Sequence, residues 1–190
     1  HVPHDHNFHF LTSGYLGPGY LSDYYEYDYF SVDGYPGEPV DMTFVKRSAL
    51  SPGKVMLYRA HRDVHNQLPA DELSVSLNIM PSMMFAHLRP QYIFNAQCTH
   101  IERTVTTSNS STEPALHLIA RCGGQKGQEF LEHVAKNGVI EEDRFRAIKA
   151  ITAALPDNSS RFEVIRKYGL NANSTMVQKM AQYYVEQLSL

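Results

Sequence analysis

The stretch VPHDHNFHF gathers three histidines, His4, His6 and His9, near the start of the sequence. Residues two apart on a β-strand project from the same face. His4 and His6 would therefore present their imidazoles together, whereas His9 would face the other way. Such a pair can begin a site for a divalent transition metal, but a stable site needs at least a third ligand. The spacing predicts a metal site that is completed elsewhere in the chain.

The best candidate for the third ligand is His65. It lies in an expected loop between two expected strands, Lys54–Arg59 and Ser74–Met80. On the later strand, Ser76 and Asn78 alternate with apolar residues, so that one face is polar. Unpaired polar groups inside a β-structure are costly. We therefore expect this face to serve a site to which His65 belongs.

The two motifs HDHNFHF and DVHNQLPADELSVSLNIM together resemble the cupin superfamily. Within it they are most similar to the three-histidine thiol dioxygenases of the cysteine dioxygenase kind. The resemblance covers residues 1–85 and says nothing about the second half of the chain. It implies a jelly-roll barrel in which His4, His6 and His65 hold Fe(II) as a facial triad.

The late strand departs from the thiol dioxygenase pattern. The positions of that family's Ser-His-Tyr relay read Ser76, Asn78 and Met80 here, so free cysteine is not carried over as the substrate. The usual cupin glutamate after the HxH motif is also missing. We expect Ser76 and Asn78, together with a tyrosine such as Tyr58, to position the substrate.

Three neutral imidazoles would leave up to three positions open on an octahedral Fe(II), whereas a structural zinc site is closed by four protein ligands. This favours a non-haem Fe(II)-dependent oxygenase that uses O2 on a small amino acid, thiol or peptide. Two alternatives stay open. One is a non-catalytic metal- or ligand-binding module whose helices contact another protein. The other is an isomerase or hydrolase that uses Zn, Ni or Mn.

The elements that must position these residues change character along the chain. Residues 1–107 alternate short strand-like segments with Gly- and Pro-rich turns, which is typical of a sandwich or barrel. Residues 108–190 follow helical periods in a series loosely similar to HEAT-like stacks. We predict an α+β chain, with a cupin-type antiparallel β-barrel over 1–107 and a helical domain over 108–190. The expected strands are Asp5–Thr12, Leu21–Tyr29, Val40–Val45, Lys54–Arg59, Leu73–Met80 and Tyr92–Cys98.

Bulk composition narrows the class of partner. With 190 residues and a net charge of −3, the chain shows no basic surplus that would favour nucleic acid. No apolar run reaches the length of a membrane span, and Cys98 and Cys122 form no metal-binding or disulfide pattern. We expect a cytoplasmic protein whose partners are O2 and a small-molecule or peptide substrate, and we also consider a homodimer. The sequence does not begin with Met, so residues can precede His1.

Overall fold

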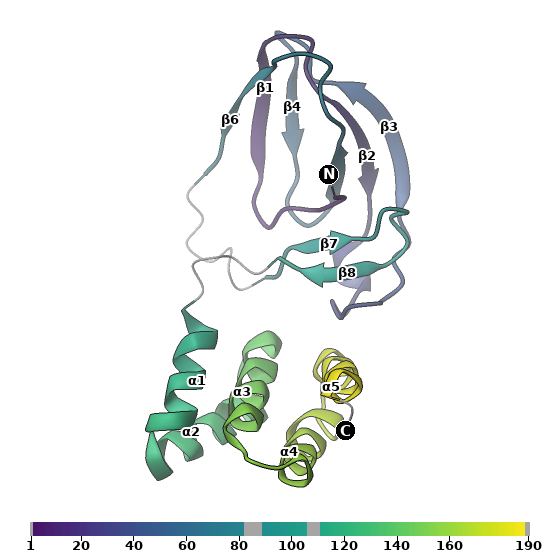
Figure 1. Ribbon diagram of the computed structural model, residues 1–190. Helices are drawn as coiled ribbons and strands as arrows, with labels where there is room; N and C mark the ends of the chain where they lie inside the picture. The colour runs from purple at the N-terminus through teal and green to yellow at the C-terminus, as the bar shows by residue number, and fades with distance from the viewer. Residues whose placement is uncertain (1, 82–88, 106–110, 189–190) are drawn as a thin grey trace. The chain divides into compact units, whose positions relative to one another are not determined.

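The computed structural model describes residues 2–81, 89–105 and 111–188 (Figure 1). The chain is α+β, with antiparallel sheets in the first half followed by five α-helices in the described part of the second half. It divides into two compact units, residues 1–105 and residues 106–190. Each unit is considered by itself below.

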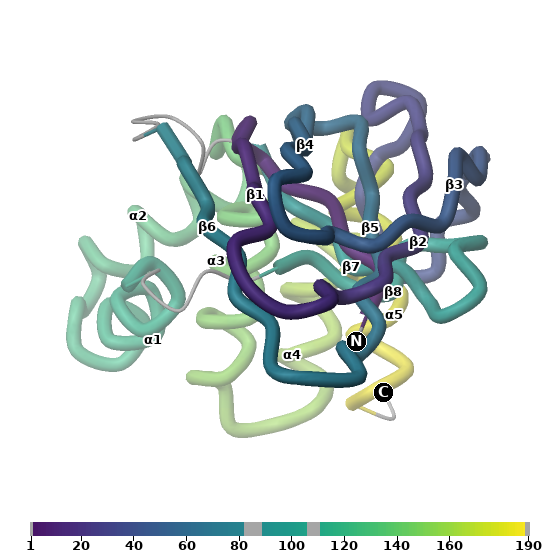
Figure 2. The backbone as a smooth tube through the Cα atoms, turned by 90° about the horizontal axis from the view of Figure 1, so that it is seen from above, coloured from purple at the N-terminus to yellow at the C-terminus, as the bar shows by residue number. Residues whose placement is uncertain are grey.

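The first unit contains two three-stranded antiparallel sheets and a two-stranded hairpin. Their strand orders are β4-β1-β6, β3-β2-β5 and β7-β8. Viewed from above, β6, β1 and β4 lie to the left of β5, β2 and β3 (Figure 2). The strands are β1 (Phe10–Leu16), β2 (Leu21–Glu26), β3 (Thr43–Ala49), β4 (Val55–Tyr58), β5 (Asp63–Gln67), β6 (Val75–Ile79), β7 (Tyr92–Phe94) and β8 (Ile101–Thr104).

Each of the six expected strands overlaps an observed one, but the prediction of a loop over residues 63–67 is wrong. These residues form β5 and not a loop. The segment DVHNQ is short and has little apolar content, so that it gives no strand signal of its own. Its backbone is held by antiparallel pairing with β2, in which Tyr24 lies opposite His65. Strand β8 is likewise additional to the expected set.

The N-terminal segment joins two of these sheets. His4 and His65 exchange both backbone hydrogen bonds, with N···O distances of 3.2 and 3.1 Å. On the other side, the backbone amide of Asp5 donates to the carbonyl of Tyr92 on β7 at 3.2 Å. The segment therefore lies between β5 and β7. The strand expected over Asp5–Thr12 begins later in the structure, because β1 starts at Phe10.

Aromatic rings connect sheet β4-β1-β6 with sheet β3-β2-β5. Phe10 on β1 stacks on Tyr58 of β4 with ring centroids 4.5 Å apart. The Tyr58 hydroxyl donates to the hydroxyl of Tyr24 on β2 at 3.2 Å. All three rings are buried, so that they form the packed layer between the two sheets.

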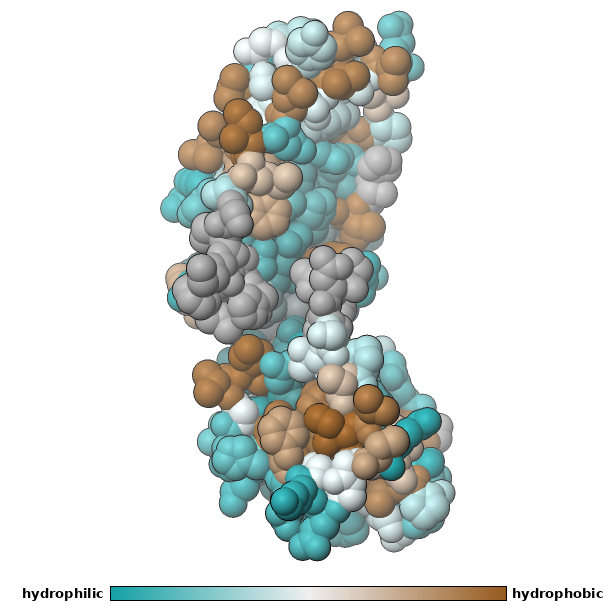
Figure 3. Space-filling view, turned by 90° about the vertical axis from the view of Figure 1, so that its left-hand side faces the viewer, coloured by the Kyte–Doolittle hydropathy of each residue, from teal (hydrophilic) through white to brown (hydrophobic). Residues whose placement is uncertain are grey.

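The outer face of sheet β4-β1-β6 is apolar and exposed. The register places Leu57 and Ile79 on either side of Leu11, and Val55 and Leu77 occupy the neighbouring rows. Figure 3 shows apolar side chains gathered on this part of the first unit. An exposed apolar cluster of this kind marks a surface that can bind a partner.

The second unit is built from helices with apolar stripes at helical spacing. Ile148 and Ile151 on the third helix are fully buried, as are Leu131 and Val177 on neighbouring helices. No described helix is long and apolar enough to cross a membrane. The helices are α1 (Thr112–Cys122), α2 (Gly124–Asn137), α3 (Glu141–Ala154), α4 (Asn158–Ile165) and α5 (Thr175–Leu188), with a π-helical turn over Arg166–Leu170.

Gly169 in the π-helical turn packs directly against α5. A Cβ atom at this position would lie 2.5 Å from the Cβ of Ala181. We expect Gly169→Ala to lower the free energy of unfolding by about 2 kcal/mol, because overpacking a closed core forces the backbone to shift. Thermal unfolding followed by far-ultraviolet circular dichroism measures the loss. The double variant with Ala181→Gly should regain much of it, and an unchanged midpoint for the single variant would contradict the contact.

Candidate metal centre

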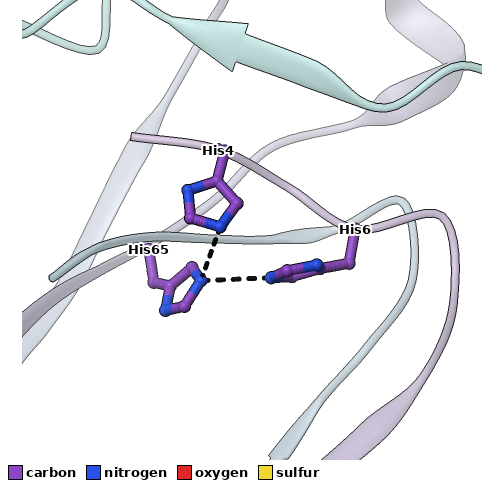
Figure 4. Close-up of side chains that lie close together, drawn as sticks. All are labelled: His4, His6 and His65. Carbon is purple, nitrogen blue, oxygen red and sulfur yellow. Dashed lines mark hydrogen bonds between the residues drawn. The ribbon is translucent and has the colours of Figure 1, made fainter. Parts of the chain in front are cut away.

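The imidazoles of His4, His6 and His65 converge on one another (Figure 4). The Nε2 atom of His65 lies 3.1 Å from the Nε2 of His4 and 3.1 Å from the Nε2 of His6. One ring nitrogen from each residue lies within 4.8 Å of the other two. Two nitrogens that each bind the same ion at ~2.1 Å and at a right angle are ~3.0 Å apart. The two spacings about His65 therefore fit a shared divalent cation.

Strand pairing is what brings these rings together. His4 and His65 are directly opposite in an antiparallel bridge, so that their side chains lie on the same face. His6 follows two residues later and shares that face, as the alternation rule predicts. His9 does not join the group. It is exposed, and its Nδ1 accepts a hydrogen bond from the amide of Ala60.

The hydrogen bonds of His4 indicate its tautomer. Its Nδ1 lies 2.9 Å from the carbonyl oxygen of Val2. A carbonyl can only accept, so that Nδ1 carries the proton and Nε2 presents a lone pair to the other rings. In the ring plane an imidazole nitrogen has either one proton or one lone pair. The Nε2 of His65 therefore cannot form full hydrogen bonds with both neighbours, whereas a cation would accept a lone pair from all three rings.

Burial keeps two of the rings neutral. His65 is 3 % exposed, and burial together with the nearby His4 and His6 lowers its pKa to about 2. Burial and the neighbouring His4 also lower the pKa of His6 to about 4. Neutral imidazole is the form that binds metal. Within the described residues, the buried Nδ1 atoms of His6 and His65 have no hydrogen-bond partner.

Aromatic side chains form one wall of the centre. The ring of Tyr58 lies 4.7 Å from that of His65, and the ring of Phe10 lies 4.7 Å from that of His6, measured between centroids. Tyr58 is 2 % exposed, and burial raises its pKa well above the usual range. Tyr58 is therefore a neutral phenol whose hydroxyl is directed to Tyr24 and whose ring covers the histidines.

Two of the predicted substrate-positioning residues lie elsewhere. Ser76 and Asn78 are on β6, at the edge of sheet β4-β1-β6, and pair with Gly14 and Thr12 of β1. Asn78 is exposed and Ser76 is half-buried. Within the described ranges, neither residue contacts the three histidines. Their proposed role in holding substrate stays a prediction, and of the three candidates the structure brings only Tyr58 against the histidines.

Asp5 is not among the site residues predicted from the sequence, because alternation turns its side chain away from those of His4 and His6. Its side chain is fully buried on the opposite face of the segment. The carboxylate accepts hydrogen bonds from the Tyr27 hydroxyl and from the Tyr92 backbone amide, both at 2.6 Å. Burial raises the pKa of Asp5 to about 6. Because Asp5 lies between His4 and His6, these bonds fix the segment that carries two of the three imidazoles.

The arrangement that emerges is three imidazoles whose ring nitrogens lie close together, with His65 deeply buried, His4 and His6 half-buried, and an aromatic wall beside them. Among the His, Cys, Asp and Glu side chains in the described part of the chain, these three histidines form a group that could hold a metal ion. Comparison of the sequence with known protein families, with curated proteins and with solved structures gives no match.

Proposed function

We propose that the first unit is a non-haem Fe(II)-dependent oxygenase of the cupin type, which uses O2 on a small amino acid, thiol or peptide. The observation that carries this proposal is the convergence of the Nε2 atoms of His4, His6 and His65. These three residues would hold the iron. Bound Fe(II) would supply the dioxygen chemistry, for which protein side chains have no substitute.

The composition of the ligand set supports an open, reactive centre. All three ligands are imidazoles, which suit Fe, Zn, Ni and Cu. Three protein ligands leave coordination positions on the metal open for the substrate and for O2, as is usual in catalytic metal sites. Neutral imidazoles also leave the charge of a divalent ion uncompensated, so that an anionic substrate group would be attracted to it.

The surrounding side chains support water exclusion on one side of the centre. Phe8 and Phe10 approach the ring of His6 at 5.3 and 4.7 Å, and Tyr58 covers His65. An apolar wall lowers the local dielectric constant and strengthens charge interactions at a metal. In this proposal the wall shields the reactive centre, while Ser76 and Asn78 contact the far end of the substrate.

The test is metal-dependent oxygen consumption. The protein is purified without oxygen, its metal content is measured, and Fe(II) is added at one equivalent per chain. Oxygen uptake is then followed with panels of amino acids, thiols and short peptides. We expect uptake that requires both Fe(II) and one class of substrate, and that is absent from His65→Ala.

Other outcomes separate the proposal from its alternatives. Tight iron binding with no uptake for any class of substrate would favour a non-catalytic metal-binding module. Stoichiometric zinc that Fe(II) does not displace, again without oxygen uptake, would favour a hydrolase or isomerase. Uptake that His65→Ala retains would show that the iron acts from another place or free in solution.

A further inference from the structure

The second unit has a basic cleft that is independent of the histidine group. It is about 470 Å³ in volume and lies where the end of α2, the start of α3 and the π-helical turn meet. Three of the side chains that line it are cationic and three are amides, and no carboxylate of the described residues lines it. The lining residues are Lys136, Asn137, Arg144, Lys167, Tyr168, Asn171, Ala172 and Asn173.

Arg144 is the central feature of this cleft because it is charged and only 8 % exposed. Its Nε donates to the carbonyl of Ala135 at 3.3 Å, and one Nη2 proton goes to the amide oxygen of Asn173 at 3.0 Å. A guanidinium has five N–H donors. Within the described residues, two of them are satisfied and no carboxylate pairs with the charge.

The acidic residues nearby are engaged with other groups. Glu142 and Asp143, on the first turn of α3, both pair with Arg146. Glu132 on α2 accepts a hydrogen bond from the Tyr168 hydroxyl. A buried charge without a counter-charge is expensive. The carbonyl of Ala135, in the last turn of α2, offsets part of this cost through the negative end of the helix dipole, and no described carboxylate offsets the rest.

The wall opposite Arg144 comes from an irregular stretch of backbone. Lys167 and Tyr168 belong to the π-helical turn, and Asn171 follows it directly. The ammonium of Lys167 lies 4.6 Å from the centre of the Tyr168 ring. This turn ends α4, and its wider spacing redirects these side chains from the regular α-helical pattern.

We propose that this cleft binds the phosphate group of a small phosphorylated molecule. Arg144 offers a planar fork for two phosphate oxygens, and Lys136 and Lys167 add point charges at the rim. Three positive charges match a doubly charged phosphate better than a single carboxylate. The volume of the cleft lies in the range of small-molecule sites and leaves room for an organic portion beside the phosphate.

The test uses the full chain, with inorganic phosphate and glycerol phosphate as probes and acetate as the carboxylate control, all at matched ionic strength. Calorimetric titration gives the affinity, and amide chemical shifts locate the site. Lys136→Gln and Lys167→Gln each remove one rim charge. Lys126→Gln is the matched control, because Lys126 is an exposed lysine on the same helix as Lys136 and does not line the cleft. Arg144 is left unchanged, since its contact with Ala135 also holds α2 to α3.

We expect both phosphate probes to shift the amides of the lining residues. Lys136→Gln and Lys167→Gln should each weaken binding about tenfold, the size of one charge-assisted hydrogen bond, while Lys126→Gln stays within about twofold of the parent. The absence of binding, an equal loss in all three variants, or acetate binding as tightly as phosphate would each overturn the proposal.

Discussion

His65→Ala should abolish stoichiometric metal binding. The Nε2 atom of His65 lies next to those of both other histidines, so that its removal leaves only two imidazoles to bind the metal ion. Loss of an outer-sphere partner of a metal ligand typically costs 10–100-fold in affinity, and loss of the ligand itself should cost at least about 100-fold. Metal content after dialysis, and competition against a chromogenic chelator, measure the change.

The controls for this result come from the same motif. His4→Ala and His6→Ala should weaken binding to a similar degree, whereas His9→Ala should retain it, because His9 lies outside the group. If each of the four variants shows the same small decrease in metal affinity, the chain binds metal as a flexible histidine-rich tag does, and the three-histidine site is contradicted. Far-ultraviolet circular dichroism of each variant checks that the overall secondary structure is retained. We expect it to be, because truncating the His65 side chain leaves the backbone hydrogen bonds of β5 in place.

Asp5→Ala should lower both stability and metal affinity. The substitution leaves two buried donors, the Tyr27 hydroxyl and the Tyr92 amide, without the carboxylate that now accepts from them. Each such donor costs about 1–3 kcal/mol, so that we expect a loss of about 3 kcal/mol in the free energy of unfolding. Urea unfolding followed by tyrosine fluorescence is suitable, since the chain has twelve tyrosines and no tryptophan.

Asp5→Asn separates geometry from charge. Its amide oxygen can accept from the Tyr92 amide, and its amide nitrogen can donate to the Tyr27 hydroxyl. Only the Tyr27 hydroxyl proton then lacks its acceptor, so that we expect Asp5→Asn to cost about 1–2 kcal/mol, less than Asp5→Ala, and to keep its metal. A severe loss of metal in Asp5→Asn, with stability unchanged, would mean that the negative charge itself acts on the metal.

The sequence predicted the grouping of the three histidines better than the backbone that carries them. The i, i+2 spacing of His4 and His6 was enough to place both rings on one face, because alternation is a property of any extended chain. The position of His65 in a strand was not predictable, since β5 forms by pairing with Tyr24 and its neighbours and with the N-terminal segment. Pairing between residues far apart leaves no mark in the local composition.

The helices were predictable because their periods are local. The stripe that includes Ile148 and Ile151 encodes α3 without reference to the rest of the chain. Arg144 on the same helix shows the limit of this reasoning. In the sequence, Arg144 is one of several charged residues at the start of a helix, where exposure is the usual expectation. Its burial depends on contacts with Ala135 and Asn173, which the helical pattern does not predict.

The position of the N-terminal segment between β5 and β7 has a consequence for biosynthesis. Asp5 is synthesised before Tyr92, so that its backbone amide gains this hydrogen-bond partner only after β7 has been made. We therefore expect the three-histidine group to gain its full backbone support late in synthesis, once β7 has emerged from the ribosome.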